Sequence, residues 1–378
     1  MASDSEKREE KQWSEFPEEL LVLIFKKLRL ISDCIRFGGV CKSWRSASQP
    51  TAATSSLHPQ LPLLLLPYLC FTDSRSFFSL STNSIHTLSL PNTCCKEILA
   101  SSHGWLLLAD FKTKAISLLN PITEAQIQLP PLPEYHPEID GTNLTTVVPH
   151  KGVISSSPSS AEHDCVVITI TCQPWKSHRR HVNFCRPGRD EVWTKLKTSP
   201  ILDSVVYSKG RFYMLDLAGV VTVYDAVDPS VKILSLPKPA FALQYFLVKA
   251  SETELLFCAY SRELSGGMDL RHFKMDLSGQ MLEWSEIDGI GDKALFLTRE
   301  KCSCSMVCAR DFPGCKEGCV YYETPFFDDD LVDAFLPQNH NIKVINIKDG
   351  SYEFIRCAAL GTSAKHLMAP VWFTPSLY

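Results

Sequence analysis

The sequence GRFYMLDLAGVVTVYD occupies residues 210–225. Two runs rich in aromatic, aliphatic and β-branched side chains, residues 210–216 and 220–225, flank a short segment that contains Ala218 and Gly219. A glycine between two such runs favours a tight turn, because glycine adopts backbone conformations that other residues avoid. The pattern therefore predicts a hairpin of two antiparallel strands.

Paired runs of the same kind recur along most of the chain. Each run is short, apolar or alternating, and bounded by turn residues, which is typical of strands. Some pairs are followed by a further strand-like run, as at residues 231–236 and 352–355. The pairs recur at intervals of roughly 30 to 50 residues, a spacing typical of propeller blades with about four strands each. The other pairs are 77–80 with 85–90, 104–109 with 115–119, 166–171 with 181–185, 255–260 with 272–277, and 320–323 with 343–347.

We therefore expect residues 63–378 to form a degenerate β-propeller of about six blades. Closing the ring would protect the edges of many short strands, and residues 370–375 are the candidate closing strand. The blades carry neither the double glycine of kelch repeats nor a Trp-Asp ending. A pair of β-sandwiches is the alternative fold. In either case the chain is mainly β with a small α-helical module at its N-terminal end.

The segment before residue 50 has helical periodicity instead. Leu20, Ile24 and Leu28 recur every four residues, and Leu21 with Phe25 forms the adjacent row. This spacing gives a helix with a broad apolar face.

Residues with known positional preferences indicate where the helices begin. Pro17 suits the first position of a helix, and Ser32 or Asp33 is a competent N-cap for a second one. Gly38 and Gly39 would weaken the middle of this second helix by about 1 kcal/mol each relative to alanine. The second helix is expected to carry Cys34, Phe37, Cys41 and Trp44.

The size of this segment raises the question of what covers its apolar faces. About forty residues hide too little surface to bury two such faces on their own. The helices therefore pack either on the rest of this chain or on a second polypeptide. Periodicity alone leaves both alternatives open.

The residues of this segment resemble an F-box. The resemblance lies in WSEFPEELL at 13–21, DCIRF at 33–37 and VCKSWR at 40–45, with Phe16 where the family usually has leucine. It implies a three-helix module that docks onto a Skp-family adaptor and, through it, a cullin. The corner at Pro17 and the stripe from Val40 to Trp44 are the favoured contacts, while some of the other residues must pack internally. The residues implied at or behind the contact are Phe16, Pro17, Leu20, Ile24, Phe25, Leu28, Val40, Cys41 and Trp44.

The larger region resembles the C-terminal domain of a plant F-box family that is related to F-box/kelch receptors. Three stretches carry this resemblance: residues 102–121, residues 291–316 and the ending WFTP at 372–375. The expected organisation is a disordered N-terminus at 1–12, the F-box at 13–50, a linker at 51–62 and the propeller from 63 to 378.

Composition narrows the classes of function. A hydrophobic share of 45% with 21% charged residues is typical of a globular protein, and a net charge of −4 gives no global field that would gather nucleic acid. Residues 1–11 lack the apolar core of a signal peptide, and residues 61–71 are too short to span a membrane. We expect a protein of the nucleus, the cytoplasm or both, with no nucleic-acid or membrane partner and with reduced cysteines.

No motif predicts a catalytic centre, a metal site or a cofactor. The densest cysteine group lacks the paired C-x-x-C spacing of zinc knuckles, which favours buried thiols. Gly289 and Gly291 superficially match a dinucleotide loop, but residues 294–297 are expected to form a strand rather than the helix that such a loop requires. The cysteine group consists of Cys302, Cys304, Cys308, Cys315 and Cys319.

The expected function is that of a non-catalytic substrate receptor in a Skp–cullin–F-box ubiquitin ligase, with an unknown protein as substrate. Segments 134–163, 175–181 and 326–335 interrupt the strand pattern with charged or aromatic residues and are candidates for substrate contact. The alternatives are a regulatory protein that binds the adaptor without promoting ubiquitin transfer, and a propeller enzyme. The candidate substrate-binding residues are Trp175, Arg179, Arg180, Phe326 and Phe327.

Overall fold

The chain divides into two compact units, one of residues 1–60 with 376–378 and the other of residues 61–375. The computed structural model describes residues 16–28, 31–48, 60–133, 148–159, 165–173, 177–196, 201–226, 228, 232–240, 242, 244–262, 268–279, 282–298, 304–323, 339–359 and 367–376. The expected disordered N-terminus at 1–12 and most of the expected linker lie outside these residues.

The described residues of the first unit form three helices: α1 (Glu18–Phe25), α2 (Ile31–Gly38) and α3 (Lys42–Ala47). Pro17 is the N-cap of α1, close to the predicted start. The prediction of one second helix reaching Trp44 is wrong, because the helix ends at Gly38 and the backbone of Cys41 is extended. The low helix propensity of two successive glycines explains the break.

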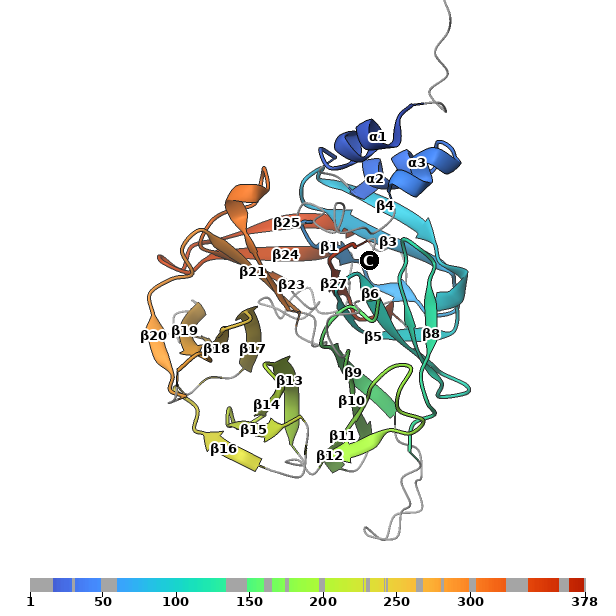
Figure 1. The fold of residues 1–378 in the computed structure, drawn as a ribbon. Helices are drawn as coiled ribbons and strands as arrows, with labels where there is room; N and C mark the ends of the chain where they lie inside the picture. The colour runs from blue at the N-terminus through green and yellow to red at the C-terminus, as the bar shows by residue number, and fades with distance from the viewer. Residues whose placement is uncertain are drawn as a thin grey trace, which may run out of the picture. The chain divides into compact units, whose positions relative to one another are not determined.

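The second unit is a β-propeller, and within the described residues its strands form six blades (Figure 1). The first blade is β27 (Val371–Phe373), β1 (Leu63–Leu65), β3 (Ser74–Ser79) and β4 (Ser84–Ser89). The second is β5 (Lys96–Ser102), β6 (Trp105–Asp110), β7 (Ile116–Leu119) and β8 (Gln126–Gln128). The third is β9 (Val148–Ile154), β10 (Val167–Gln173), β11 (Ser177–Cys185) and β12 (Thr194–Leu196).

The remaining blades complete the ring. The fourth is β13 (Leu202–Ser208), β14 (Arg211–Asp216), β15 (Val221–Asp225) and β16 (Lys232–Leu236). The fifth is β17 (Gln244–Ser251), β18 (Glu254–Arg262), β19 (Met268–Asp276) and β20 (Ser285–Ile287). The sixth, in spatial order, is β22 (Ser305–Cys308), β21 (Lys293–Leu297), β23 (Cys319–Glu323), β24 (Asn339–Asn346) and β25 (Tyr352–Ala359). A short pair, β2 (Tyr68–Leu69) with β26 (Leu367–Met368), lies outside the blades.

The predicted propeller and its closing strand are confirmed. Strand β27 pairs antiparallel with β1, with Leu63 opposite Phe373 and Leu65 opposite Val371. One blade is thus built from both ends of the propeller sequence, which removes the open edge that an unclosed sheet would present. The sandwich alternative does not describe this arrangement.

The hairpin at residues 210–225 is also confirmed, as β14 and β15. One carboxylate oxygen of Asp216 accepts hydrogen bonds from the backbone amides of Ala218 and Val220, both at 2.9 Å. Gly219 has a φ of 81°, and a Cβ atom added there would lie 2.9 Å from the ring of Tyr245. Both the backbone conformation and the available space therefore require glycine in this turn.

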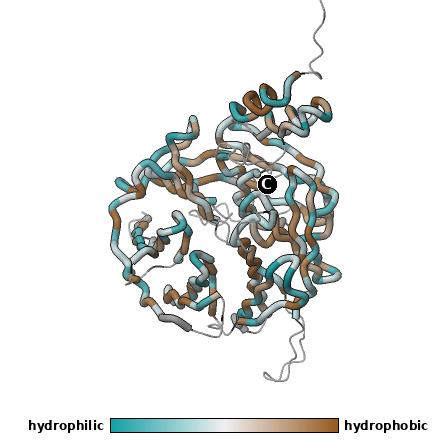
Figure 2. Tube along the Cα trace, viewed as in Figure 1, coloured by the Kyte–Doolittle hydropathy of each residue, from teal (hydrophilic) through white to brown (hydrophobic). Residues whose placement is uncertain are grey.

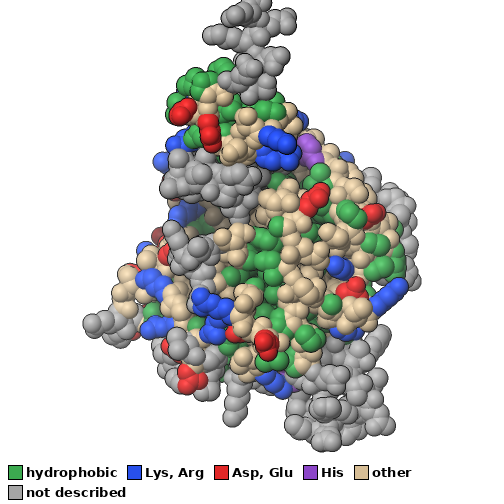
Figure 3. Space-filling view, turned by 45° about the vertical axis from the view of Figure 1, so that its right-hand side comes forward, with side chains coloured by type: hydrophobic (Ala, Val, Ile, Leu, Met, Phe, Trp, Pro, Cys, Tyr) green, Lys and Arg blue, Asp and Glu red, His purple; other side chains and the backbone are tan. Residues whose placement is uncertain are grey.

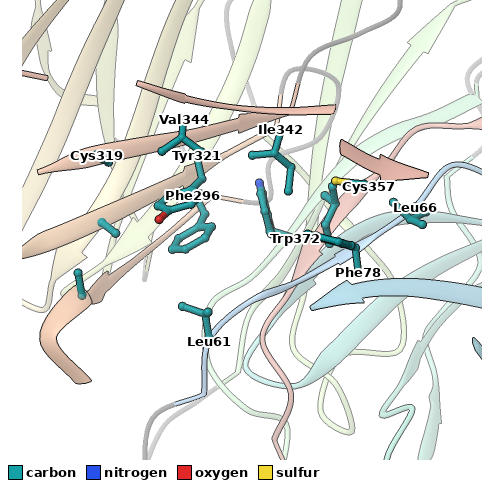
Figure 4. Close-up of a cluster of buried hydrophobic side chains, with 13 residues drawn as sticks. Leu61, Leu66, Phe78, Phe296, Cys319, Tyr321, Ile342, Val344, Cys357 and Trp372 are labelled. Carbon is teal, nitrogen blue, oxygen red and sulfur yellow. The ribbon is translucent and has the colours of Figure 1, made fainter. Parts of the chain in front are cut away.

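Apolar side chains from neighbouring blades form shared buried clusters. Hydrophobic and hydrophilic residues alternate along the chain (Figure 2). At the closing blade, the ring of Trp372 lies edge-on to Phe296, with their centroids 4.9 Å apart, and Phe296 stacks on Tyr321 at 4.8 Å (Figure 4). The indole Nε1 of Trp372 donates a hydrogen bond to the Leu297 carbonyl at 3.1 Å. The closing strand is thus held by side-chain packing in addition to its backbone pairing.

We expect Trp372→Ala to lower the free energy of unfolding of the propeller by about 3 to 5 kcal/mol, because it removes a large buried ring and leaves a cavity. Urea denaturation of the full chain would measure this. The matched control is Phe354→Ala, which removes an aromatic ring that is half exposed on β25 and should cost much less. Equal losses from the two variants would contradict a special role for the closing strand.

His272 lies on β19 with 1% of its surface exposed, and burial lowers the pKa of its imidazole to about 4. In the unfolded chain a histidine has a pKa near 6.5, so below that pH the unfolded state binds the additional proton. Stability should therefore be complete above pH 6.5 and should fall by up to about 3 kcal/mol toward pH 4.

Replacing His272 with leucine should flatten this part of the stability curve, measured by urea denaturation from pH 7 to pH 4. The control is His86→Leu, at an exposed histidine on β4, which should leave the slope in place. The interpretation fails if the His272→Leu and wild-type curves remain parallel.

Candidate functional site

The helical unit has a small core centred on Phe37. The Phe37 ring centroid lies 5.3 Å from that of Phe25 and 4.4 Å from that of Trp44. This packing joins one residue from each helix and fixes which side of α1 faces inward. The buried members of the core are Leu21, Phe25, Cys34, Phe37 and Ala47, and Phe16, Val22, Leu28 and Trp44 pack partly buried against them.

Helix α1 is apolar on its other side as well. Residues 20–25 are six consecutive apolar residues, LLVLIF, in a helix of only eight (Figure 2). Leu20, Leu23 and Ile24 are exposed by 45%, 55% and 36%. They stand at positions i, i+3 and i+4, so they share one face. We call these three residues the outer face of α1.

A further exposed apolar side chain lies at the α2–α3 junction, where Val40 is 54% exposed. Green apolar atoms gather on the surface of the helical unit in Figure 3. A helix that is apolar all round is normally covered on all sides. The outer face of α1 is therefore suited to bury itself on another surface.

The structure divides the predicted adaptor-binding residues into three groups. Pro17, Leu20, Ile24 and Val40 are exposed. Phe25 is 1% exposed and packs in the core, so among the residues predicted at or behind the contact it lies behind it. The half-buried residues are Phe16, Leu28, Cys41 and Trp44.

Leu23 was missed by the sequence prediction, although it is the most exposed apolar residue of α1. The prediction followed the i, i+4 rows of Leu20 and Leu21. The i+3 spacing from Leu20 to Leu23 was the signal that could have identified it.

The predicted substrate-binding residues of the propeller are placed only in part. Trp175, Phe326 and Phe327 lie outside the described residues, and so does the side chain of Arg179. Arg180 belongs to strand β11 rather than to a loop, which corrects the interpretation of residues 177–181. Its guanidinium Nη1 donates to the carbonyl of Leu202 at 2.6 Å and to Asp203 Oδ1 at 2.9 Å. Arg180 is thus fixed within the propeller.

The same carboxylate oxygen also accepts a hydrogen bond from Lys151 Nζ at 2.9 Å. The three side chains Lys151, Arg180 and Asp203, which we call the charge cluster, are 7%, 16% and 23% exposed. Burial raises the pKa of the Asp203 carboxyl, but the two cations lower it by more, so its pKa lies below the usual range. The cluster therefore contains two positive charges and one negative charge.

A small cavity lies among the inner strands, between the ends of β5 and β9 and the middle of β13 and β17. Ser101, His103, Ser155 and Lys249 line it, and Lys249 forms an ion pair with Glu252 at 2.6 Å. Partial removal from water, followed by the charge of Lys249, lowers the pKa of His103, although the residue still has an exposed surface. The cavity therefore has little net charge.

Six of the described cysteines are buried and the others are partly buried. Burial raises the pKa of Cys315 to about 11 and that of Cys185 and Cys357 to about 12, which disfavours the nucleophilic thiolate at neutral pH. In the described part of the chain, no three His, Cys, Asp or Glu side chains gather as metal ligands. Residues 293–297, which follow the Gly289–Gly291 segment, form strand β21 as predicted.

No helix in the described ranges is long and apolar enough to cross a bilayer.

Comparison with known proteins agrees with both units. The KIB1-4 β-propeller family matches residues 77–346, and the F-box-like family matches residues 13–52. Three Arabidopsis thaliana proteins are similar over most of their length. F-box/kelch-repeat protein At1g57790 is 28% identical over 77% of this chain and 78% of its own, and F-box protein At2g26160 is 26% identical over 83% and 96%. F-box protein SKIP23 is 25% identical over 91% of each chain. The chain therefore belongs to the KIB1-4 β-propeller family and is a plant F-box protein with a six-bladed propeller.

Proposed function

We propose that this protein is the substrate-recognition subunit of a Skp–cullin–F-box ubiquitin ligase. In this role the helical unit binds a Skp-family adaptor, which connects it to a cullin, and the propeller binds the protein to be ubiquitylated. The observation that supports the proposal most directly is the outer face of α1, three adjacent apolar side chains exposed on a helix whose opposite face is already buried.

The energetics of this face favour association. Fully burying a leucine or isoleucine side chain contributes about 1.5 to 3 kcal/mol, and roughly half of each of these three is still exposed. Covering Leu20, Leu23 and Ile24 would therefore contribute about 2 to 4 kcal/mol. Val40 and the exposed corner at Pro17 extend the apolar surface available to the partner.

The proposed mechanism is proximity rather than acid–base chemistry in this chain. A receptor that holds its substrate beside a ubiquitin-charged enzyme raises the effective concentration of the substrate lysines at that enzyme. Such a role requires two binding surfaces and no nucleophile. The high thiol pKa values of Cys185, Cys315 and Cys357 are compatible with it.

The double variant Leu23→Asp/Ile24→Asp should weaken binding to a purified Skp-family adaptor at least a hundredfold, because it places two charges in an apolar contact. Isothermal titration calorimetry with the full chain would measure the change. The matched control is Leu217→Asp, at a leucine that is 48% exposed in the β14–β15 turn of the propeller. Its binding should match that of the wild type.

Circular dichroism of the double variant should show an intact fold, because both side chains already contact water. Phe37→Ala serves as the contrasting case, since it removes the centre of the core and should unfold the helical unit. Unchanged adaptor binding by the folded double variant would refute the proposed docking surface.

Proteins captured by the wild-type chain from proteasome-inhibited cells should be ubiquitylated when the complete ligase is reconstituted with them. The Leu23→Asp/Ile24→Asp chain should still capture these proteins through its propeller, yet it should not support their ubiquitylation. Capture without ubiquitylation by the wild-type complex would instead favour a regulatory protein that binds the adaptor without promoting transfer.

A further inference from the structure

The charge cluster lies where two neighbouring blades of the propeller meet. Lys151 is on β9 and Asp203 is on β13, the inner strands of the third and fourth blades (Figure 1). Arg180 is on β11, opposite Cys172, which in turn pairs with the first residue of β9. The cluster therefore joins the middle of β9 and β11 to the first residues of β13.

The cluster has one carboxylate for two cations. Lys151 Nζ and Arg180 Nη1 both lie 2.9 Å from the same oxygen, Asp203 Oδ1. An ion that is largely removed from water is costly unless it is paired, and a single carboxylate can neutralise only one of these two charges. Among the described residues, one positive charge is therefore left over in a place that water reaches only in part.

Other ion pairs of the propeller lack this imbalance. Arg271 and Glu286 form a one-to-one pair in which Nε and Nη2 each donate to a carboxylate oxygen at 2.8 Å. Lys316 and Glu353 are likewise paired at 2.6 Å. Both pairs are about half exposed, so solvent screens them, whereas the charge cluster is more buried.

Lys151 and Arg180 have more N–H hydrogen-bond donors than their described hydrogen bonds use. An ammonium group has three N–H donors and a guanidinium has five. Within the described part of the chain, Lys151 uses its ammonium group on Asp203 alone, and Arg180 uses only Nη1, on Leu202 and Asp203. A lysine and an arginine held side by side provide the charge and the donors that phosphate and carboxylate groups require.

We propose that Lys151 and Arg180 form a binding site for an oxyanion, a phosphate or carboxylate group, carried by a peptide segment of the protein that the propeller recognises. The identity of the carrier as a substrate rests on the proposed function, whereas anion binding itself does not. Asp203 holds the two cations together, and the bound anion supplies the missing negative charge.

The test is thermal unfolding of the full chain in a titration with inorganic phosphate or with acetate, with sodium chloride balancing the ionic strength. The melting temperature of the wild type should rise with at least one of the two oxyanions relative to chloride, because a ligand that binds only the folded state stabilises it. Lys151→Met and Arg180→Gln should each lose most of this rise.

Each of these variants leaves one cation paired with Asp203, so Lys151→Met should not be less stable than the wild type in chloride, whereas Arg180→Gln also loses the hydrogen bond to the Leu202 carbonyl and should be slightly less stable. The matched control is Arg271→Gln, at an arginine with its own carboxylate partner, which should retain the full response. A larger rise with phosphate than with acetate assigns the site to phosphorylated peptides, and the reverse assigns it to acidic side chains or a terminal carboxylate.

The proposal is overturned if neither oxyanion shifts the wild type beyond chloride, or if Lys151→Met and Arg180→Gln respond as the wild type does. It is also overturned if both variants are destabilised in chloride and the wild type shows no response to oxyanions, because the cluster would then serve only the fold. Adaptor binding by both variants should equal that of the wild type. Failure of the anion test is therefore distinguishable from failure of the proposed function.

Discussion

The antiparallel pairing of residues 371–373 with residues 63–65 is the constraint on which the propeller depends. Five of the six blades are formed by strands that follow one another closely in sequence, but the first blade exists only when its inner strand arrives from the other end of the propeller. The contact is therefore highly non-local, and forming it costs loop-closure entropy. Burial of Trp372 against Phe296 and closure of the ring offset this cost. Lys151 and Asp203 meet because β9 and β13 are the inner strands of neighbouring blades.

The local hairpins and the closing strand at the end of the chain were predictable from the sequence, whereas the order of the strands within the sixth blade was not. The β14–β15 hairpin followed from alternating residues around Gly219, because the turn and both strands lie within sixteen residues. The sixth blade contains a parallel pair, β21 with β23, and β22 is inserted on its inner side. No periodicity in the sequence distinguishes this order from a simple meander, since the pattern of each strand is the same whichever neighbour it pairs with.

The predictions of the candidate site residues were limited in the same way, because they depend on contacts between elements. Periodicity identified α1 as an apolar helix, but the position of Phe37 decides that Phe25 faces inward and Leu23 outward, and Phe37 comes from another helix. Arg180 appeared to belong to a basic loop because its partner Asp203 lies 23 residues away on the next blade. Both errors concern which neighbour a side chain meets, and that information arises only when the elements are packed together.

The two surfaces differ in the physical basis of recognition. The outer face of α1 is apolar, and apolar burial is non-directional and little affected by salt, so it suits a partner that is the same in every complex. The charge cluster instead has hydrogen-bond donors in a fixed geometry and one surplus positive charge. These features favour binding of an anionic group over a cation or an apolar side chain at the same place. The Lys151 side chain is only 7% exposed, so solvent would screen its attraction for a bound anion poorly. The difference in affinity between a charged and a neutral group should therefore be larger here than at an exposed pair such as Arg271 and Glu286. Under the proposed function, the helical unit would keep one constant contact while the charge of the group presented to the propeller would govern which proteins are selected.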